Sequence, residues 1–179
     1  MPQSPVILEA AGLRLSFHAY GDRLAHTVGL VVGNRVVPLL ASVEGTPDDD
    51  WPPSPPLTTI ELSSQGEVQH ALLLGMAGRS HWSVAVVLSE AARRLEFEIA
   101  CRMKEPASSL GSAYRTMVAA RSHEQGVALV VDNETVRVDG PSQQPAVHVT
   151  PDGLNVPVEP PAGPFPQTVR WSYAICRLR

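Results

Sequence analysis

The chain has 179 residues and a formal net charge of −4 at pH 7, and 44% of its residues are hydrophobic while 18% are charged. This is enough apolar material for the core of one domain spanning residues 1–179, and too little charge for a disordered chain. The small acidic excess supplies no basic field for nucleic acid or an anionic membrane, so we expect neither as a partner.

The start of the chain and its cysteines bear on the cell compartment. Residues 1–5 lack the basic start and apolar run of a signal peptide, and no segment has the about 20 continuous apolar residues that cross a bilayer. Cys101 and Cys176 lack the paired spacing of a zinc or redox motif. We therefore expect a cytoplasmic protein with two buried thiols, a disulfide between them being the alternative.

Prolines and glycines, 17 and 13 in number, separate short segments in which apolar and polar residues alternate. This period of two is typical of half-buried β-strands. Residues 13–20 are the first such segment, with Leu13, Leu15 and Phe17 on one face. Residues 46–56, TPDDDWPPSPP, interrupt the pattern and predict an exposed connection or a cover over a strand edge, because proline cannot donate a ladder hydrogen bond.

Within this proline-rich loop, we expect Trp51 to pin the chain to the core. Asp48 to Asp50 lack the spaced ligands of a calcium loop, so we expect a solvated acidic segment there. A second proline-rich loop, PVEPPAGPFP at residues 157–166, is also predicted to be an exposed connection. Both loops contain P-x-x-P, which is also the pattern of polyproline ligands.

The middle of the chain predicts a β-meander that can be registered from its apolar faces. In the first hairpin, at residues 68–88, Leu74 is placed opposite Trp82, and every second residue back to His70 then lies on the buried face. We therefore expect His70 to be a core histidine. Trp82 also lies on this buried face.

The meander continues into a third strand, with Leu88 opposite Leu95 and Trp82 opposite Cys101. A fourth strand at residues 112–120 is predicted to return beside the third. The parity of that strand places Tyr114 in the core.

Downstream, residues 127–138 and 146–158 predict two more hairpins, because turn residues separate their apolar halves. Trp171 and Tyr173 alternate with polar residues in a last strand and are expected to be buried, with stacking on a sugar or a peptide as the alternative. The one helix signal, at residues 89–94, is too short to sustain a helix. The sequence thus predicts an all-β antiparallel sandwich or jelly-roll-like closure with a central meander.

The familiar sequence motifs of enzymes and metal sites are missing from the chain. It contains no glycine-rich phosphate loop, no nucleophile elbow and no histidine pair with metal-ligand spacing. We therefore expect no cofactor and no metal. Two histidines near predicted loops, His26 and His123, receive no partner from the sequence.

The outward face of the meander predicts a cluster of polar residues. The register places His81 opposite Arg102 and Glu98 on the same face, and one register of the fourth strand places Arg115 opposite Glu98. Arginine offers planar donors, glutamate accepts from hydroxyls, and histidine exchanges a proton near neutral pH, so these four residues are our candidates for binding a small polar ligand. The alternative is that they decorate a solvated sheet face.

Two functions from different classes are consistent with these features. The first is a non-catalytic binding or assembly module for a protein partner, which includes a homo-oligomer, because catalytic motifs are absent from a chain rich in strands and proline loops. The second is a small carbohydrate-active enzyme or sugar-binding domain, with His81 and Glu98 as a proton-transfer pair and Arg102 and Arg115 orienting the substrate. The first predicts an exposed apolar patch or an open strand edge, and the second predicts a concave polar face.

Overall fold

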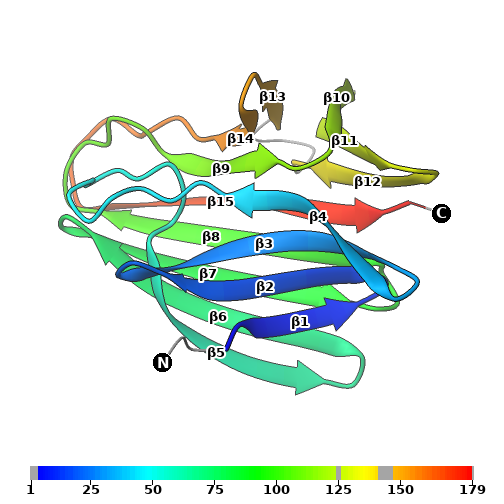
Figure 1. The fold of residues 1–179 in the computed structure, drawn as a ribbon. Coiled ribbons are helices and arrows are strands. Elements are labelled where there is room, and N and C mark those ends of the chain that lie inside the picture. Colours follow the sequence, from blue (N-terminus) through cyan, green and yellow to red (C-terminus); the bar gives the residue numbers. More distant parts are fainter. Residues whose placement is uncertain (1–3, 124–125, 141–146, 179) are drawn as a thin grey trace.

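The computed structural model describes residues 4–123, 126–140 and 147–178, and the regular elements in these ranges are all β-strands. They form two antiparallel sheets that pack face to face, which confirms the predicted β-sandwich (Figure 1). In spatial order, the seven-stranded sheet consists of β1 (Val6–Ala10), β2 (Leu13–Tyr20), β3 (Arg23–Val32), β4 (Arg35–Ser42), β9 (Gly111–Thr116), β14 (Gly153–Pro157) and β13 (His148–Thr150). In the same way, the eight-stranded sheet consists of β10 (Ala119–His123), β11 (Gly126–Val131), β12 (Glu134–Asp139), β15 (Gln167–Arg177), β8 (Arg94–Met103), β7 (Ser80–Ser89), β6 (Val68–Ala77) and β5 (Leu57–Gln65).

Inward-facing side chains of the two sheets form the hydrophobic core. In β2 the odd-numbered residues up to Phe17 are buried, as their alternation predicts. Aromatic rings fill the space between the sheets: Phe97 stacks on Tyr173 with ring centroids 4.9 Å apart, and Trp82 meets Trp171 edge to face at 5.9 Å. These aromatic residues are therefore core residues, and the alternative of a stacking platform for a ligand is excluded for Trp171 and Tyr173.

The predicted register between β6 and β7 is wrong by one residue. In the structure Leu74 pairs with Ser83, and Leu73 pairs with Val84. Because side chains alternate between the faces of a sheet, this shift moves each predicted core residue of β6 to the outer face. His70 is consequently not a core histidine: it faces outward and is half-buried.

The turn between these strands and the composition of β6 explain the error. Ala77 pairs with Ser80, so Gly78 and Arg79 form a two-residue hairpin loop, and Gly78 has a φ of 51° that suits glycine. β6 reads VQHALLLGMA and is apolar on both faces, so apolar pairing supports either register. The tight turn decides between the two.

The register between β7 and β8 is confirmed, including Leu88 opposite Leu95 and Trp82 opposite Cys101. The predicted fourth strand is wrong. Residues 112–120 divide into β9 and β10, which lie in different sheets, and β15 occupies the place beside β8. The physical reason is ladder length, because β15 forms ten residue pairs with β8 whereas β9 has only six residues in all.

The two downstream hairpins are confirmed as β11 with β12 and β13 with β14. Ala146, the first residue predicted for the second of them, lies outside the described residues. Residues 157–166 are a connection of exposed and half-buried residues, as expected.

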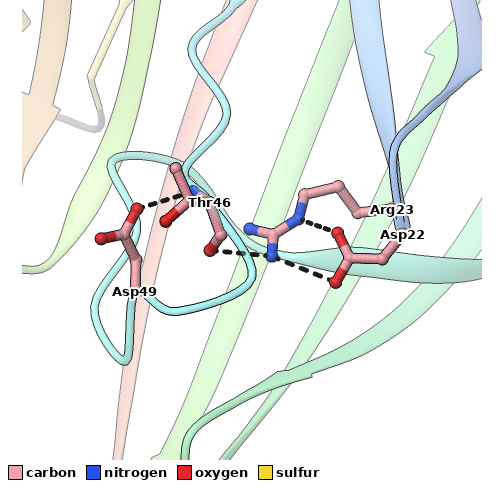
Figure 2. Close-up of polar contacts among 4 residues, drawn as sticks. All are labelled: Asp22, Arg23, Thr46 and Asp49. Carbon is pink, nitrogen blue, oxygen red and sulfur yellow. Dashed lines mark hydrogen bonds and ion pairs between the residues drawn. The ribbon is translucent and has the colours of Figure 1, made fainter.

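The other proline-rich loop, residues 46–56, is anchored at its start by a buried arginine (Figure 2). The Arg23 side chain is only 4% exposed; its Nε donates to Asp22 Oδ1 at 2.9 Å, and its Nη2 donates to the Thr46 carbonyl at 3.1 Å. Asp49 Oδ2 accepts from the Thr46 amide at 2.6 Å. Arg23 is the first residue of β3, so its side chain ties the loop to that strand.

The second half of this loop is buried, which corrects the expectation of an exposed connection. Pro55 and Pro56 are buried, and Ser54 Oγ donates to the Ala113 carbonyl at 2.9 Å while accepting from the Ala113 amide. These bonds give the loop the polar partners that its prolines cannot provide. Trp51 is half-buried against the core, as predicted.

Both cysteines are free thiols. Cys101 is buried, whereas Cys176 is only half-buried, so the expectation of two buried thiols holds for one of them. Cys176 pairs with Arg94, seven residues along β8 from Cys101. That separation is about 23 Å along a strand, and a disulfide needs Cα atoms about 4.4–6.8 Å apart, so the disulfide alternative is excluded.

Candidate functional site

The structure brings together part of the predicted polar cluster. His81 pairs with Arg102 between β7 and β8, and Glu98 lies on the same outer face of the eight-stranded sheet. All three side chains are exposed. Glu98 is four residues from Arg102 along β8, a separation of about 13 Å.

This spacing limits what the cluster can do chemically. His81 and Glu98 are not within hydrogen-bond reach, as a proton-transfer pair would need to be. Within the described ranges, His81, Glu98 and Arg102 make neither ion pairs nor side-chain hydrogen bonds with one another. The geometry supports a polar surface that a partner can contact, and it provides no converging acid and base.

Arg115 does not belong to this cluster. It lies on β9 in the seven-stranded sheet, where it pairs with Ala41, and Ser172 of β15 takes the place opposite Glu98. The error follows from the misplaced fourth strand. Arg115 instead contributes to a hollow on the other face of the molecule.

A shallow groove of about 500 Å³ runs beside His81 and Arg102. Its floor contains the small residues Ser83 and Ala100, and Arg170 of β15 also lines it. Small side chains on β7 and β8 therefore leave the middle of this face recessed between longer side chains on either side.

The other side of the groove is formed by Leu74 and Met76 of β6, and Leu72 continues their row beyond the groove. Leu72, Leu74 and Met76 are 48%, 50% and 55% exposed. They occupy every second position of one strand and project from the outer face, and we call them the β6 stripe. The sequence interpretation missed the β6 stripe, because the predicted register, which is wrong by one residue, assigned Leu72 and Leu74 to the core.

Strand β5, next to the β6 stripe, is one of the two edge strands of the eight-stranded sheet (Figure 1). Its sequence, LTTIELSSQ, contains one charged residue and no proline, and all but two of its residues are exposed. Edge strands of soluble proteins usually carry charges or prolines that prevent pairing with another chain. β5 therefore presents backbone donors and acceptors that an added strand can bond.

Strand β1, an edge of the seven-stranded sheet, is protected in a way that β5 is not. The side-chain amide of Gln69 donates to the Glu9 carbonyl at 2.9 Å and accepts from the Glu9 amide at 3.0 Å. One side chain thus occupies both backbone groups of a β1 residue. Among the described hydrogen bonds, none caps the outer edge of β5 in this manner.

A buried polar network between the two sheets was also missed by the sequence interpretation. His26 Nε2 bonds the Tyr114 hydroxyl at 2.8 Å, and that hydroxyl also bonds the hydroxyl of Tyr173. Trp171 Nε1 donates to Ser112 Oγ at 3.2 Å. The one available signal was a histidine inside a mostly apolar strand, β3.

The electrostatics of this network indicate a structural role. Burial lowers the pKa of His26 to about 3, with a smaller contribution from the charge of His18, so the imidazole is neutral near pH 7. Burial also raises the pKa of Tyr114 well above its usual value. All these side chains are buried, and they hold the sheets together through neutral hydrogen bonds.

Metal-binding clusters and membrane-spanning helices are absent from the residues that the structure describes. No three histidine, cysteine, aspartate or glutamate side chains are grouped so that they could hold a metal ion. No helix there has the length and apolar character needed to cross a membrane. Comparison of the chain with protein-family models and with curated proteins gives no match.

Proposed function

We propose that this chain is a non-catalytic binding module that holds a protein partner on the outer face of its eight-stranded sheet. The observation that carries the proposal is the β6 stripe, in which three large apolar side chains are each about half exposed. Single exposed apolar residues are ordinary on protein surfaces, whereas a contiguous patch is typical of an interaction site.

The surroundings of the stripe resemble the rim of a protein interface. His81 and Arg102 lie beyond Met76, while Glu61 and Glu98 flank the stripe near Leu72. An apolar centre with a polar rim is the usual anatomy of such interfaces, and the rim charges favour a partner of complementary charge.

The open edge of β5 supports the same proposal. An extended segment of a partner can pair with β5 and continue the sheet, because backbone hydrogen bonds give affinity regardless of side-chain identity. The next part of that partner then reaches the β6 stripe, since β5 and β6 are adjacent. We therefore expect the partner to contribute a strand together with apolar side chains that cover the stripe.

The test compares the wild-type chain with a variant in which the stripe is made polar, Leu72→Ser, Leu74→Ser and Met76→Ser. Each tagged protein is used for affinity purification from its native cells, and the co-purifying proteins are quantified by mass spectrometry. We expect a stoichiometric partner with the wild type and at least a tenfold lower yield with the stripe variant. The residues replaced are already half exposed, so the variant is expected to fold.

Met117→Ser is the matched control, because Met117 is 55% exposed, like Met76, and lies outside the stripe. This control should retain the partner at the wild-type yield. The proposal is wrong if no protein is captured, or if the stripe variant keeps the partner as well as the control does. Light scattering of the purified chain over a range of concentrations tests self-association. If the wild type forms a stable dimer and the stripe variant does not, the partner on this face is a second copy of the chain.

A further inference from the structure

The outer face of the seven-stranded sheet contains a hollow of about 590 Å³, on the side of the molecule opposite the β6 stripe. Its floor is made of small residues on three neighbouring strands: Ala25 of β3, Ala41 of β4 and Ala113 of β9. This volume is in the range of small-molecule sites, about 300–1,000 Å³.

One wall of the hollow is formed by β2. Tyr20 is 56% exposed, and His18 lies two residues earlier on the same outward face. A tyrosine with its ring open to solvent offers a flat apolar surface and a hydroxyl that can donate or accept. This combination suits the ring of a sugar, which has apolar C–H faces and polar edges.

The opposite wall is formed by β9 and by the β13–β14 hairpin. Arg115 is exposed there, and Asp152 and Asn155 also line the hollow. Together they offer guanidinium donors, carboxylate acceptors and an amide that does both, which is the mixture that several neighbouring hydroxyl groups require. Arg115 lies three strand spacings from β2, about 14 Å, and is level with Ser16, so Tyr20 is offset by a further four residues, about 13 Å, along its strand. The distance between the two residues therefore suits an oligosaccharide better than a single sugar residue.

Polar atoms behind the floor are incompletely satisfied. Glu44 and His26 both line the hollow, and within the described part of the chain Glu44 Oε2 and His26 Nδ1 are buried without a hydrogen-bond partner. The Ser42 hydroxyl donates to Glu44 Oε1 at 2.5 Å, which holds that carboxyl group in place. The His26 ring packs against Phe17 and Phe97 on the core side of the sheet, so the polar groups that a ligand meets are those of the two walls.

From these observations we propose that the hollow between Tyr20 and Arg115 is a binding site for a carbohydrate, distinct from the protein-binding face. Tyr20 stacks on one sugar ring of an oligosaccharide, and Arg115, Asp152 and Asn155 bond the hydroxyl groups of a ring further along the same chain. A sugar-binding site of this kind was expected on the other sheet around His81. Of the residues predicted for it, only Arg115 lies in this hollow.

The test uses a printed array of mono- and oligosaccharides, probed with the labelled full-length chain. The sugar bound most strongly is then titrated by calorimetry into the wild type and into Tyr20→Ala and Arg115→Ala. We expect each substitution to weaken binding at least tenfold. Both residues are exposed, and circular dichroism of each variant verifies its fold.

Arg102→Ala is the matched control, because it removes an exposed arginine from the opposite sheet. This variant and the variant with a polar β6 stripe should bind the sugar as the wild type does. The proposal is overturned if no sugar on the array binds, or if binding survives both Tyr20→Ala and Arg115→Ala. Binding that is lost in Arg102→Ala but kept in Arg115→Ala would also overturn it, because the sugar would then occupy the other face.

Discussion

The hydroxyl of Tyr114 on β9 is hydrogen-bonded to the hydroxyl of Tyr173 on β15, and this contact joins the two sheets through the core. The Tyr114 hydroxyl also bonds His26 Nε2 at 2.8 Å. A hydroxyl can donate one hydrogen bond and accept others, so both neighbours depend on it. Removing it leaves two buried polar groups without this partner.

Replacing Tyr114 with phenylalanine should therefore lower the free energy of unfolding by about 1–3 kcal/mol, the cost of leaving buried polar groups unpaired. Urea unfolding followed by circular dichroism measures this change. Tyr20→Phe is the control, because Tyr20 is exposed, and its effect should stay within about 0.5 kcal/mol. Equal effects of the two substitutions would contradict a role for the buried network in stability.

The stability of the protein should fall as the pH is lowered from 7 to 5. The pKa of His26 is lowered to about 3 in the folded protein, whereas an unfolded histidine has a pKa near 6.5. Below pH 6.5 the unfolded state therefore binds a proton that the folded state does not, and this costs about 2 kcal/mol of folding stability by pH 5. The stability continues to fall until the pH reaches the pKa of His26 in the folded protein, about 3.

The comparison variant is His26→Gln, which should lose less stability over the same pH interval than the wild type. Burial raises the pKa of Glu44, which favours the folded state as the pH falls, but this contribution is common to both proteins. Urea unfolding at pH 5, 6 and 7 measures the difference. Parallel pH profiles for the two proteins would show that His26 is not the responsible group.

Replacing Gly75 with alanine should displace the chain where it enters β5. A Cβ atom at Gly75 would lie 1.7 Å from the Pro56 carbonyl oxygen, so the backbone would have to move. We expect a loss of about 1–3 kcal/mol in the free energy of unfolding and faster hydrogen exchange of the β5 amides. Ser83→Ala, on the neighbouring strand, should change stability by less than about 0.5 kcal/mol. Unchanged exchange in β5 would count against this close approach.

The two cysteines should differ in reactivity. Burial raises the pKa of Cys101 to about 12, so its thiol is both protonated and shielded, whereas Cys176 is partly accessible. Iodoacetamide should modify Cys176 before Cys101 in the native protein, and both after unfolding, as measured by mass spectrometry of peptides. Modification of Cys101 at the rate of Cys176 would contradict the buried position.

The β7–β8 ladder could be predicted because its two faces differ in polarity. Trp82 and Leu88 alternate with polar or small residues on β7, and the same alternation on β8 leaves one register that keeps the core apolar. β6 has no such difference, since Leu73 and Leu74 are equally apolar while only one of them is buried. The β6 stripe could therefore not be found from alternation, although it carries the proposed function.

Long-range pairing was the second source of error. Arg115 was placed beside Glu98 because consecutive strands often pair, yet the chain crosses to the other sheet after β8. The strand that does pair there, β15, lies about 70 residues further along the chain. No local pattern near Arg115 shows that β15, and not the strand of Arg115, is the neighbour of β8.

The sequence by itself determined the all-β class, most strand positions, the turns, and which side of a strongly alternating strand faces the core, because these depend on the period of apolar residues and on turn chemistry. The tertiary structure alone decided which strands become neighbours and that His26, Tyr114 and Tyr173 meet. Those outcomes depend on competition between ladders and on packing across two sheets. The exposed face of β6 follows from the two-residue turn at Gly78 and Arg79, which the alternation of apolar residues does not reveal. Of the proposed sites, the β6 stripe follows from this turn and the hollow beside Arg115 from the order of the strands.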